Sequence, residues 1–192
     1  MSGSAGEGDD GQAMTAAPSD RGLPRIAGHV VAPIGLEDGA DWAEFALLPE
    51  VQRYTSSAYA SVDDLLPVIR RTLSDDPGAP LLFTVRQAGP GELVATFGFH
   101  TISPLNRTAE VTYTVRPEAW GRGLGTHVCN AAVEWGFRAR GWVRIQATVL
   151  EPNVASRRVL ERCGFAFEGT LRNLRIVRGQ PSDFLLYATV PA

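Results

Sequence analysis

Tyr113-Thr-Val-Arg-Pro-Glu-Ala-Trp-Gly-Arg-Gly-Leu-Gly-Thr126 is the stretch that decides the fold of this 192-residue chain. The run 109–115 is rich in strand-forming residues and leads into a loop with three alternating glycines, Gly121, Gly123 and Gly125. A segment with helical periodicity follows at once. A glycine-rich turn at a helix start leaves backbone N–H groups free at the positive end of the helix dipole, so the stretch predicts a diphosphate site.

The spacing of the glycines argues against two common nucleotide-binding loops. A Walker loop needs Gly-Lys-Ser/Thr after four intervening residues, and no such string occurs. A dinucleotide fingerprint starting at Gly121 needs a third glycine at position 126, where Thr126 stands. Arg122, inside the loop, suits a multiply charged ligand. For the loop alone, the alternative is a tight strand-to-helix turn whose glycines only permit close packing.

A second motif, Asn153-Val-Ala-Ser156, leads into a helical run that ends at Cys163-Gly-Phe165. Together with the loop, it resembles the GNAT superfamily of acyl-CoA N-acyltransferases, whose pyrophosphate motif is (Gln/Arg)-x-x-Gly-x-(Gly/Ala). Trp120 departs from that motif at the Gln/Arg position. Within the superfamily, the strings 104–113 and 168–172 look most like the ribosomal-protein N-terminal acetyltransferases of the RimJ/RimL type. The resemblance runs from roughly residue 30 to residue 190.

The resemblance implies an α/β (α+β) fold with a mixed, mostly antiparallel seven-stranded sheet and about four helices. The hydrophobic periodicity agrees with this order of elements, although on its own it predicts only a mixed α/β class. The helix after the glycine loop is expected to end at Gly141. Ser61 and Asp64 are expected to form a capping box at the start of another helix.

The resemblance also implies acetyl-CoA as co-substrate, with direct attack by an amine in a ternary complex. The strand edge at Thr114 and Val115 is expected to pair with the pantetheine arm and to place a backbone N–H on the thioester oxygen. Asn153 would hydrogen-bond that arm or merely cap its helix. Ser156 would protonate the departing thiolate, and Arg158 would reach a phosphate, unless both are ordinary helix-surface residues. The expected diphosphate loop is Trp120, Gly121, Arg122, Gly123, Leu124, Gly125 and Thr126.

The proton acceptor is expected at Glu110, a carboxylate that would work directly or through water with a pKa raised by burial. A purely structural carboxylate is the alternative. Arg175 stands where the RimL-like branch is expected to carry an acidic residue. Arg172, Arg175 and Arg178 would then read an anionic acceptor, or they form a solvated basic edge. Asp183 would neutralise one of them or bind an acceptor ammonium.

Two acceptor classes remain open, a protein N-terminus and a small amine such as an antibiotic, a polyamine or an aminoacyl compound. The Arg175 departure also leaves open a non-catalytic acyl-CoA-binding regulatory module. The cysteines and histidines share no metal-binding spacing, so no metal is expected. His29, His100 and His127 are treated as non-catalytic, with His100 the least certain of the three.

Composition restricts the remaining possibilities. A net charge of −3, from 21 acidic and 18 basic residues, argues against nucleic-acid binding. No apolar run approaches the length needed to span a bilayer, and the N-terminus lacks the basic region and apolar stretch of a signal peptide, so a cytoplasmic protein is expected. A monomer and a homodimer both remain open. Residues 1–25 are rich in Gly, Ser, Ala, Asp and Pro and predict a disordered extension before a single domain at 26–192.

Overall fold

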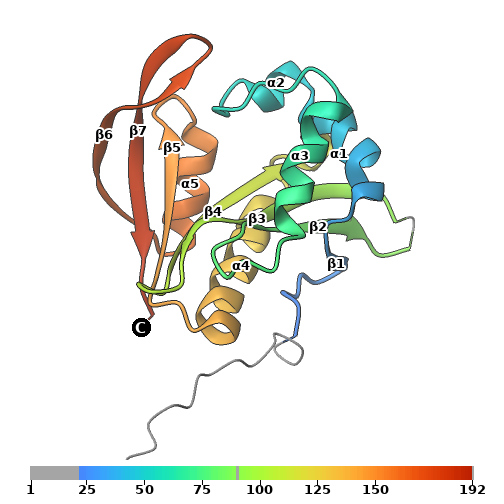
Figure 1. Cartoon of the computed structure of the whole chain (residues 1–192), viewed down its shortest axis with the longest axis horizontal. Coiled ribbons are helices and arrows are strands. Elements are labelled where there is room, and N and C mark those ends of the chain that lie inside the picture. The colour runs from blue at the N-terminus through green and yellow to red at the C-terminus, as the bar shows by residue number, and fades with distance from the viewer. Residues whose placement is uncertain (1–21, 90, 192) are drawn as a thin grey trace, which may run out of the picture.

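A sheet of seven strands organises the computed structural model, which describes residues 22–89 and 91–191 (Figure 1). The strands are β1 His29–Pro33, β2 Leu81–Gln87, β3 Leu93–Ser103, β4 Thr108–Val115, β5 Arg144–Leu150, β6 Ala166–Val177 and β7 Gln180–Thr189. The α-helices in this part of the chain are α1 Gly39–Ala46, α2 Pro49–Gln52, α3 Val62–Thr72, α4 Leu124–Arg140 and α5 Val154–Arg162. The predicted α/β fold is confirmed. The short helix α2 was not predicted; it begins with a proline at its first position.

The sheet divides between β4 and β5, which form its parallel pair. The strand order is β1-β2-β3-β4-β5-β7-β6. Within the described residues, the pairing of β4 with β5 runs only from Thr108 opposite Arg144 to Glu110 opposite Gln146. Beyond Glu110 the two strands diverge, while β3 stays paired with β4 as far as Val115. The backbone of residues 111–115 therefore has a free edge on its β5 side.

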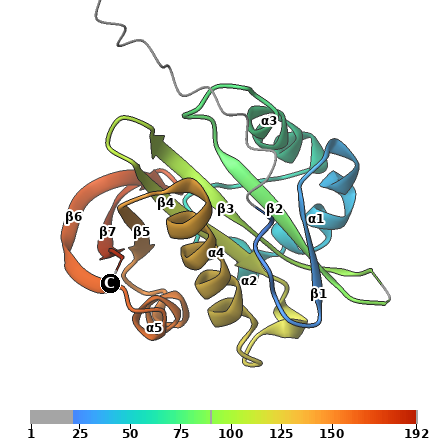
Figure 2. The ribbon, with the colours of Figure 1, turned by 90° about the horizontal axis from the view of Figure 1, so that it is seen from below.

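Helices cover both faces of the sheet. Leu82 and Phe83 are neighbours in β2 yet join different apolar clusters, because successive side chains of a strand point to opposite faces. The larger cluster packs α4 and α5 against β2–β5 and β7, and Figure 2 shows α4 running across the strands. The smaller cluster packs α1 and α3 on the other face. This arrangement holds the beginnings of α4 and α5 next to the divergence of β4 and β5.

Local signals fix several element ends. Asp64 accepts a hydrogen bond from the Ser61 N–H at 3.0 Å at the start of α3, as the predicted capping box requires. Gly141 ends α4 with a φ of +66°, a left-handed conformation that favours glycine. Arg178 and Gly179 both have positive φ in the turn between β6 and β7, so Val177 pairs with Gln180 and β7 begins earlier than the predicted Phe184.

The N-terminal extension predicted at 1–25 falls mostly outside the described residues. Pro24 is buried, and the Trp135 indole N–H donates to the Gly22 carbonyl at 2.7 Å. Packing against the domain thus begins a few residues before the predicted boundary at 26. Across the described ranges, no helix combines the length and the apolar character that a membrane crossing requires.

Candidate active site

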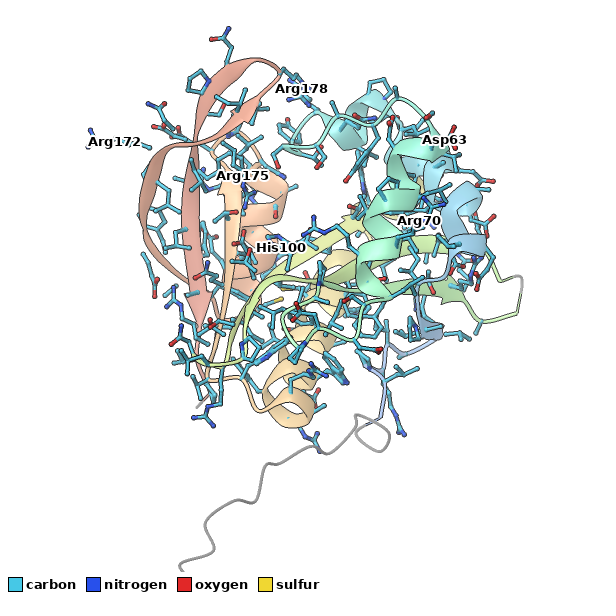
Figure 3. The ribbon with its side chains drawn as sticks, in the orientation of Figure 1. Asp63, Arg70, His100, Arg172, Arg175 and Arg178 are labelled. Atoms are coloured by element: carbon cyan, nitrogen blue, oxygen red, sulfur yellow. The ribbon has the colours of Figure 1, made fainter. Side chains whose placement is uncertain are left out.

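A cleft of about 830 Å³ lies where β4 and β5 diverge. Its walls come from β2–β5, the glycine loop, α5, the region of α1–α3, and Arg175 and Phe184 of the β6–β7 hairpin. Figure 3 shows His100 and Arg175 between the β5–β7 side of the molecule and α3. Of the predicted site residues, four are not among those that line the cleft: Arg122, Arg172, Arg178 and Asp183.

The glycine loop presents unused backbone donors to one end of the cleft. Gly121 and Gly123 have φ of +73° and +83°, which turn the chain sharply into α4. The Trp120 N–H donates to the Pro117 carbonyl, and the Thr126 N–H donates to the Gly123 carbonyl. Between these two residues, the N–H groups of residues 121–125 donate to no group in the described part of the chain. These donors at the start of a 17-residue helix fit a diphosphate.

Trp120 stands where the family motif has Gln or Arg, and its side chain makes a contact that the motif does not predict. Its indole N–H donates to the Val115 carbonyl at 2.7 Å, at the end of the free β4 edge. Thr114, Val115 and Trp120 all line the cleft. The indole therefore helps to hold the end of the strand that is expected to pair with the pantetheine arm.

The start of α5 brings polar groups to the same wall. The Asn153 side-chain oxygen accepts from the Ser156 N–H at 3.1 Å and so caps the helix, which leaves the Asn153 amide nitrogen for another partner. The Ser156 hydroxyl shares a hydrogen bond of 2.9 Å with the Tyr113 hydroxyl. Burial raises the pKa of Tyr113, so this phenol stays neutral. Tyr113 was not predicted as a site residue; no local pattern in β4 indicates its contact with α5.

Glu110 lies at the base of the cleft and is only 4% exposed. One of its oxygens accepts from the Thr148 hydroxyl at 2.5 Å and from the Arg175 guanidinium at 3.1 Å. The other accepts from the Gln146 amide at 3.4 Å. Burial is the largest influence and opposes ionisation, but the Thr148 hydrogen bond, the nearby His100 and Arg175, and Gln146 together lower the pKa of Glu110. The predicted rise in the pKa was wrong, because burial was considered without these partners.

His100 stands directly opposite Glu110 in the register of β3 and β4. Its Nε2 is 3.8 Å from a Glu110 oxygen, its Nδ1 is 2.9 Å from the Thr101 hydroxyl, and its side chain is 35% exposed. Burial lowers the pKa of His100; Glu110 acts against this shift, and Arg175 and Arg71 add to it. The ring is therefore neutral at neutral pH. His100 was predicted to be non-catalytic, as the least certain of the three histidines. Its proximity to Glu110 comes from strand pairing, which leaves no spacing signal along the chain.

The residues that were predicted to bind the acceptor amine do not lie together in the structure. Arg175 is half-buried, pairs with Glu110, and lies 5.0 Å from the centre of the Phe184 ring. Arg172 points outward in Figure 3, and Arg178 donates to the carbonyl of Gln52, the last residue of α2. Asp183 accepts from the Asn173 N–H at 2.8 Å, at an irregularity in the pairing of β6 and β7.

A second cation that was not predicted enters the cleft from α3. Arg71 lies in the last turn of that helix and lines the cleft. It is also close enough to His100 to lower the pKa of the ring. The positive charge at the acceptor end therefore comes from Arg71 and Arg175, on opposite sides of the cleft, and not from a row of arginines along β6.

Comparisons with known proteins identify the family of the chain. A family model described as an acetyltransferase (GNAT) domain matches residues 30–166. The uncharacterized N-acetyltransferase YoaA of Bacillus subtilis (strain 168) is 40% identical over 99 residues, 52% of this chain and 56% of that protein. The ribosomal-protein-serine acetyltransferase of Escherichia coli (strain K12) is 28% identical over 99 residues, 52% of this chain and 55% of that protein. The alignments thus span little more than half the length of either relative.

A solved structure shares the fold over a longer range. The spermidine N-acetyltransferase from Vibrio cholerae, in complex with CoA and spermine, matches with a TM-score of 0.75. The match covers 85% of this chain and 96% of that chain at 21% sequence identity. At this identity the likeness shows the common fold.

Proposed function

The chain belongs to the acetyltransferase (GNAT) domain family, and from this premise we propose that it acetylates a primary amine that has a carbonyl or carboxylate oxygen close by. It is an acetyl-CoA-dependent N-acetyltransferase. The acceptor class is inferred from one observation. The guanidinium groups of Arg71 and Arg175 both line the end of the cleft where the acceptor is proposed to bind.

Three features at the opposite end of the cleft suit the binding of acetyl-CoA. The free N–H groups of residues 121–125 suit its diphosphate, and the unpaired β4 edge suits the amides of its pantetheine arm. The amide nitrogen of Asn153 would serve the same arm. Ser156, linked to the Tyr113 hydroxyl, would pass a proton to the departing thiolate. The reaction proposed is direct attack by the amine nitrogen on the thioester carbon within a ternary complex.

The positive charge at the acceptor end of the cleft favours amines that carry oxygen atoms over polyamines. Glu110 and Glu50 are the carboxylates among the described residues that line the cleft, and Glu110 is already paired with Arg175. A polyamine offers several cationic nitrogens and no hydrogen-bond acceptor, so it would be repelled by Arg71, while the charge of Glu110 is already matched by Arg175. An aminoacyl compound or a peptide N-terminus offers oxygen acceptors next to its amine. The E. coli relative is named as acting on a ribosomal protein, which supports the second group.

A panel of amines tests this proposal. The rate of CoA release should be measured with an amino acid, an amino-acid amide, a short peptide with a free N-terminus, and spermidine. We expect kcat/KM to be highest for an acceptor with a carbonyl or carboxylate oxygen. If spermidine is the best of the four acceptors, the acceptor class is wrong even though the reaction type stands.

The substitution Arg71→Gln should weaken acceptor binding selectively. We expect the KM of an oxygen-bearing acceptor to rise by about 3–10-fold, since an exposed charge-assisted contact is lost. The KM of acetyl-CoA should not change. The matched control is Arg70→Gln, because Arg70 is the preceding residue of α3, is exposed, and does not line the cleft (Figure 3). Equal effects of the two substitutions on the acceptor would show that Arg71 acts only through general charge.

A further inference from the structure

Acetylation of an amine needs a group in the cleft that can take a proton from the ammonium form of the acceptor. Such a group must be unprotonated at neutral pH, exposed to the cleft, and supplied with a free lone pair. Glu110 meets the first condition but is poorly suited to the other two. Its side chain is almost fully buried at the base of the cleft. One of its oxygens accepts from both Thr148 and Arg175, and the other accepts from Gln146, so three of its four lone pairs are already used.

His100 meets all three conditions. Its ring lines the cleft and is about one-third exposed. Nε2 lies 3.8 Å from Glu110, too far for a hydrogen bond. In the tautomer whose Nδ1 proton is donated to the Thr101 hydroxyl, Nε2 carries the free lone pair and can take another partner. We propose that His100 accepts the proton of the acceptor amine and that Glu110 is a positioning residue that attracts and orients the imidazolium. This inference rests on the proposed function and names a residue for its proton-transfer step.

The charges around His100 decide its basicity. Glu110 faces it from β4, Arg175 from β6 and Arg71 from α3. Burial and the two guanidinium groups lower the pKa of His100, whereas Glu110 raises it. The neutral, reactive ring is therefore the main form above a pH somewhat below the ordinary histidine value of about 6.5. Activity should fall as the pH drops through this lowered pKa.

All three protons of the ammonium group are accounted for in the proposed acetyl transfer. His100 takes one proton from the ammonium group, and the amine nitrogen then bonds to the thioester carbon. The C–S bond breaks, and the thiolate receives a second proton of the amine nitrogen by way of the Ser156 hydroxyl. The third proton stays on the new amide nitrogen. His100 finally releases its proton to solvent, so the products are the N-acetylated acceptor, CoA and one proton.

The test uses the full chain, with the best acceptor of the panel, over a range of pH from about 5 to 9. His100→Gln should lower kcat by about 10²–10⁴-fold and abolish the acidic limb of the pH profile, with the KM of acetyl-CoA unchanged. Added imidazole should restore part of the rate to His100→Ala, which a purely structural role would not permit. Glu110→Gln should keep the limb but move it to lower pH, because the carboxylate that raises the pKa of His100 is lost.

His29→Gln is the control, because His29 lies in β1 outside the cleft with its Nδ1 against the Ala27 carbonyl. Melting temperatures of all variants separate loss of folding from loss of rate. A His100→Gln enzyme with nearly full rate and an intact acidic limb would overturn the proposal. So would a Glu110→Gln enzyme in which the limb is abolished, since Glu110 itself would then be the base. Absence of turnover by the wild-type chain with every amine would instead overturn the proposed function.

Discussion

Gly123→Asp is expected to weaken CoA binding by at least about 100-fold, as measured by isothermal titration calorimetry. The new carboxylate would stand among the free N–H groups of residues 121–125, where the diphosphate is proposed to bind, and would repel it. Crowding inside the protein is not the cause, because the nearest atom that an added Cβ would meet, apart from the adjoining residues, is His127 Cε1 at 3.9 Å. Because Gly123 has a φ of +83°, any side chain there also strains the backbone, so the loss has to be compared with that of a second side chain of the same shape.

The matched substitution Gly123→Asn separates charge from bulk. Asparagine has nearly the same shape as aspartate and tolerates the left-handed conformation that Gly123 adopts, with a φ of +83°. It should weaken CoA binding clearly less than aspartate does. If a folded Gly123→Asp protein binds CoA like the wild type, the diphosphate does not bind at this loop.

Gly98→Ala should lower the free energy of unfolding by about 3 kcal/mol or more. Gly98 lies in β3, and an added Cβ would stand 1.9 Å from the Leu81 carbonyl oxygen of β2. Backbone atoms cannot yield as a flexible side chain does, so β2 and β3 would have to separate. For a chain of this size, the loss corresponds to a fall in melting temperature of about 6 °C or more.

Gly78→Ala is the control for this stability measurement. Its added Cβ would meet the Asp76 carboxylate and the Ile102 carbonyl at 3.4 Å, at the edge of ordinary contact, so we expect a loss below about 1 kcal/mol. Gly98 also lies two residues before His100 in β3. Any residual activity of Gly98→Ala would therefore be expected to fall further than its stability alone accounts for.

The fold and the glycine loop were predictable because their signals are local. The three alternating glycines, the helical periodicity after them and the glycine at 141 lie within one stretch of chain, and α4 has the predicted end. The capping box at Ser61 is equally local. The helix α2 was missed because four residues carry too little periodicity to be recognised.

The acceptor end was less predictable because its contacts join distant segments. Arg175 meets Glu110 across 65 residues of chain, and His100 meets Glu110 through the pairing of β3 and β4. The same reason explains why three arginines that are close in the sequence do not form a cluster in the structure. Residues 172, 175 and 178 are close in sequence, yet the irregular pairing between β6 and β7 and the hairpin turn send them in three directions.

If the pantetheine arm binds as proposed, the divergence of β4 and β5 also links co-substrate binding to folding stability. Residues 111–115 keep one backbone edge without a strand partner, so the sheet is incomplete before the co-substrate arrives. A pantetheine arm laid along this edge would act as a missing strand. Because such a ligand binds the folded chain and not the unfolded one, the melting temperature should climb with CoA concentration. In a cell that is short of CoA, the protein would be more open to local unfolding and proteolysis at the very cleft where it works.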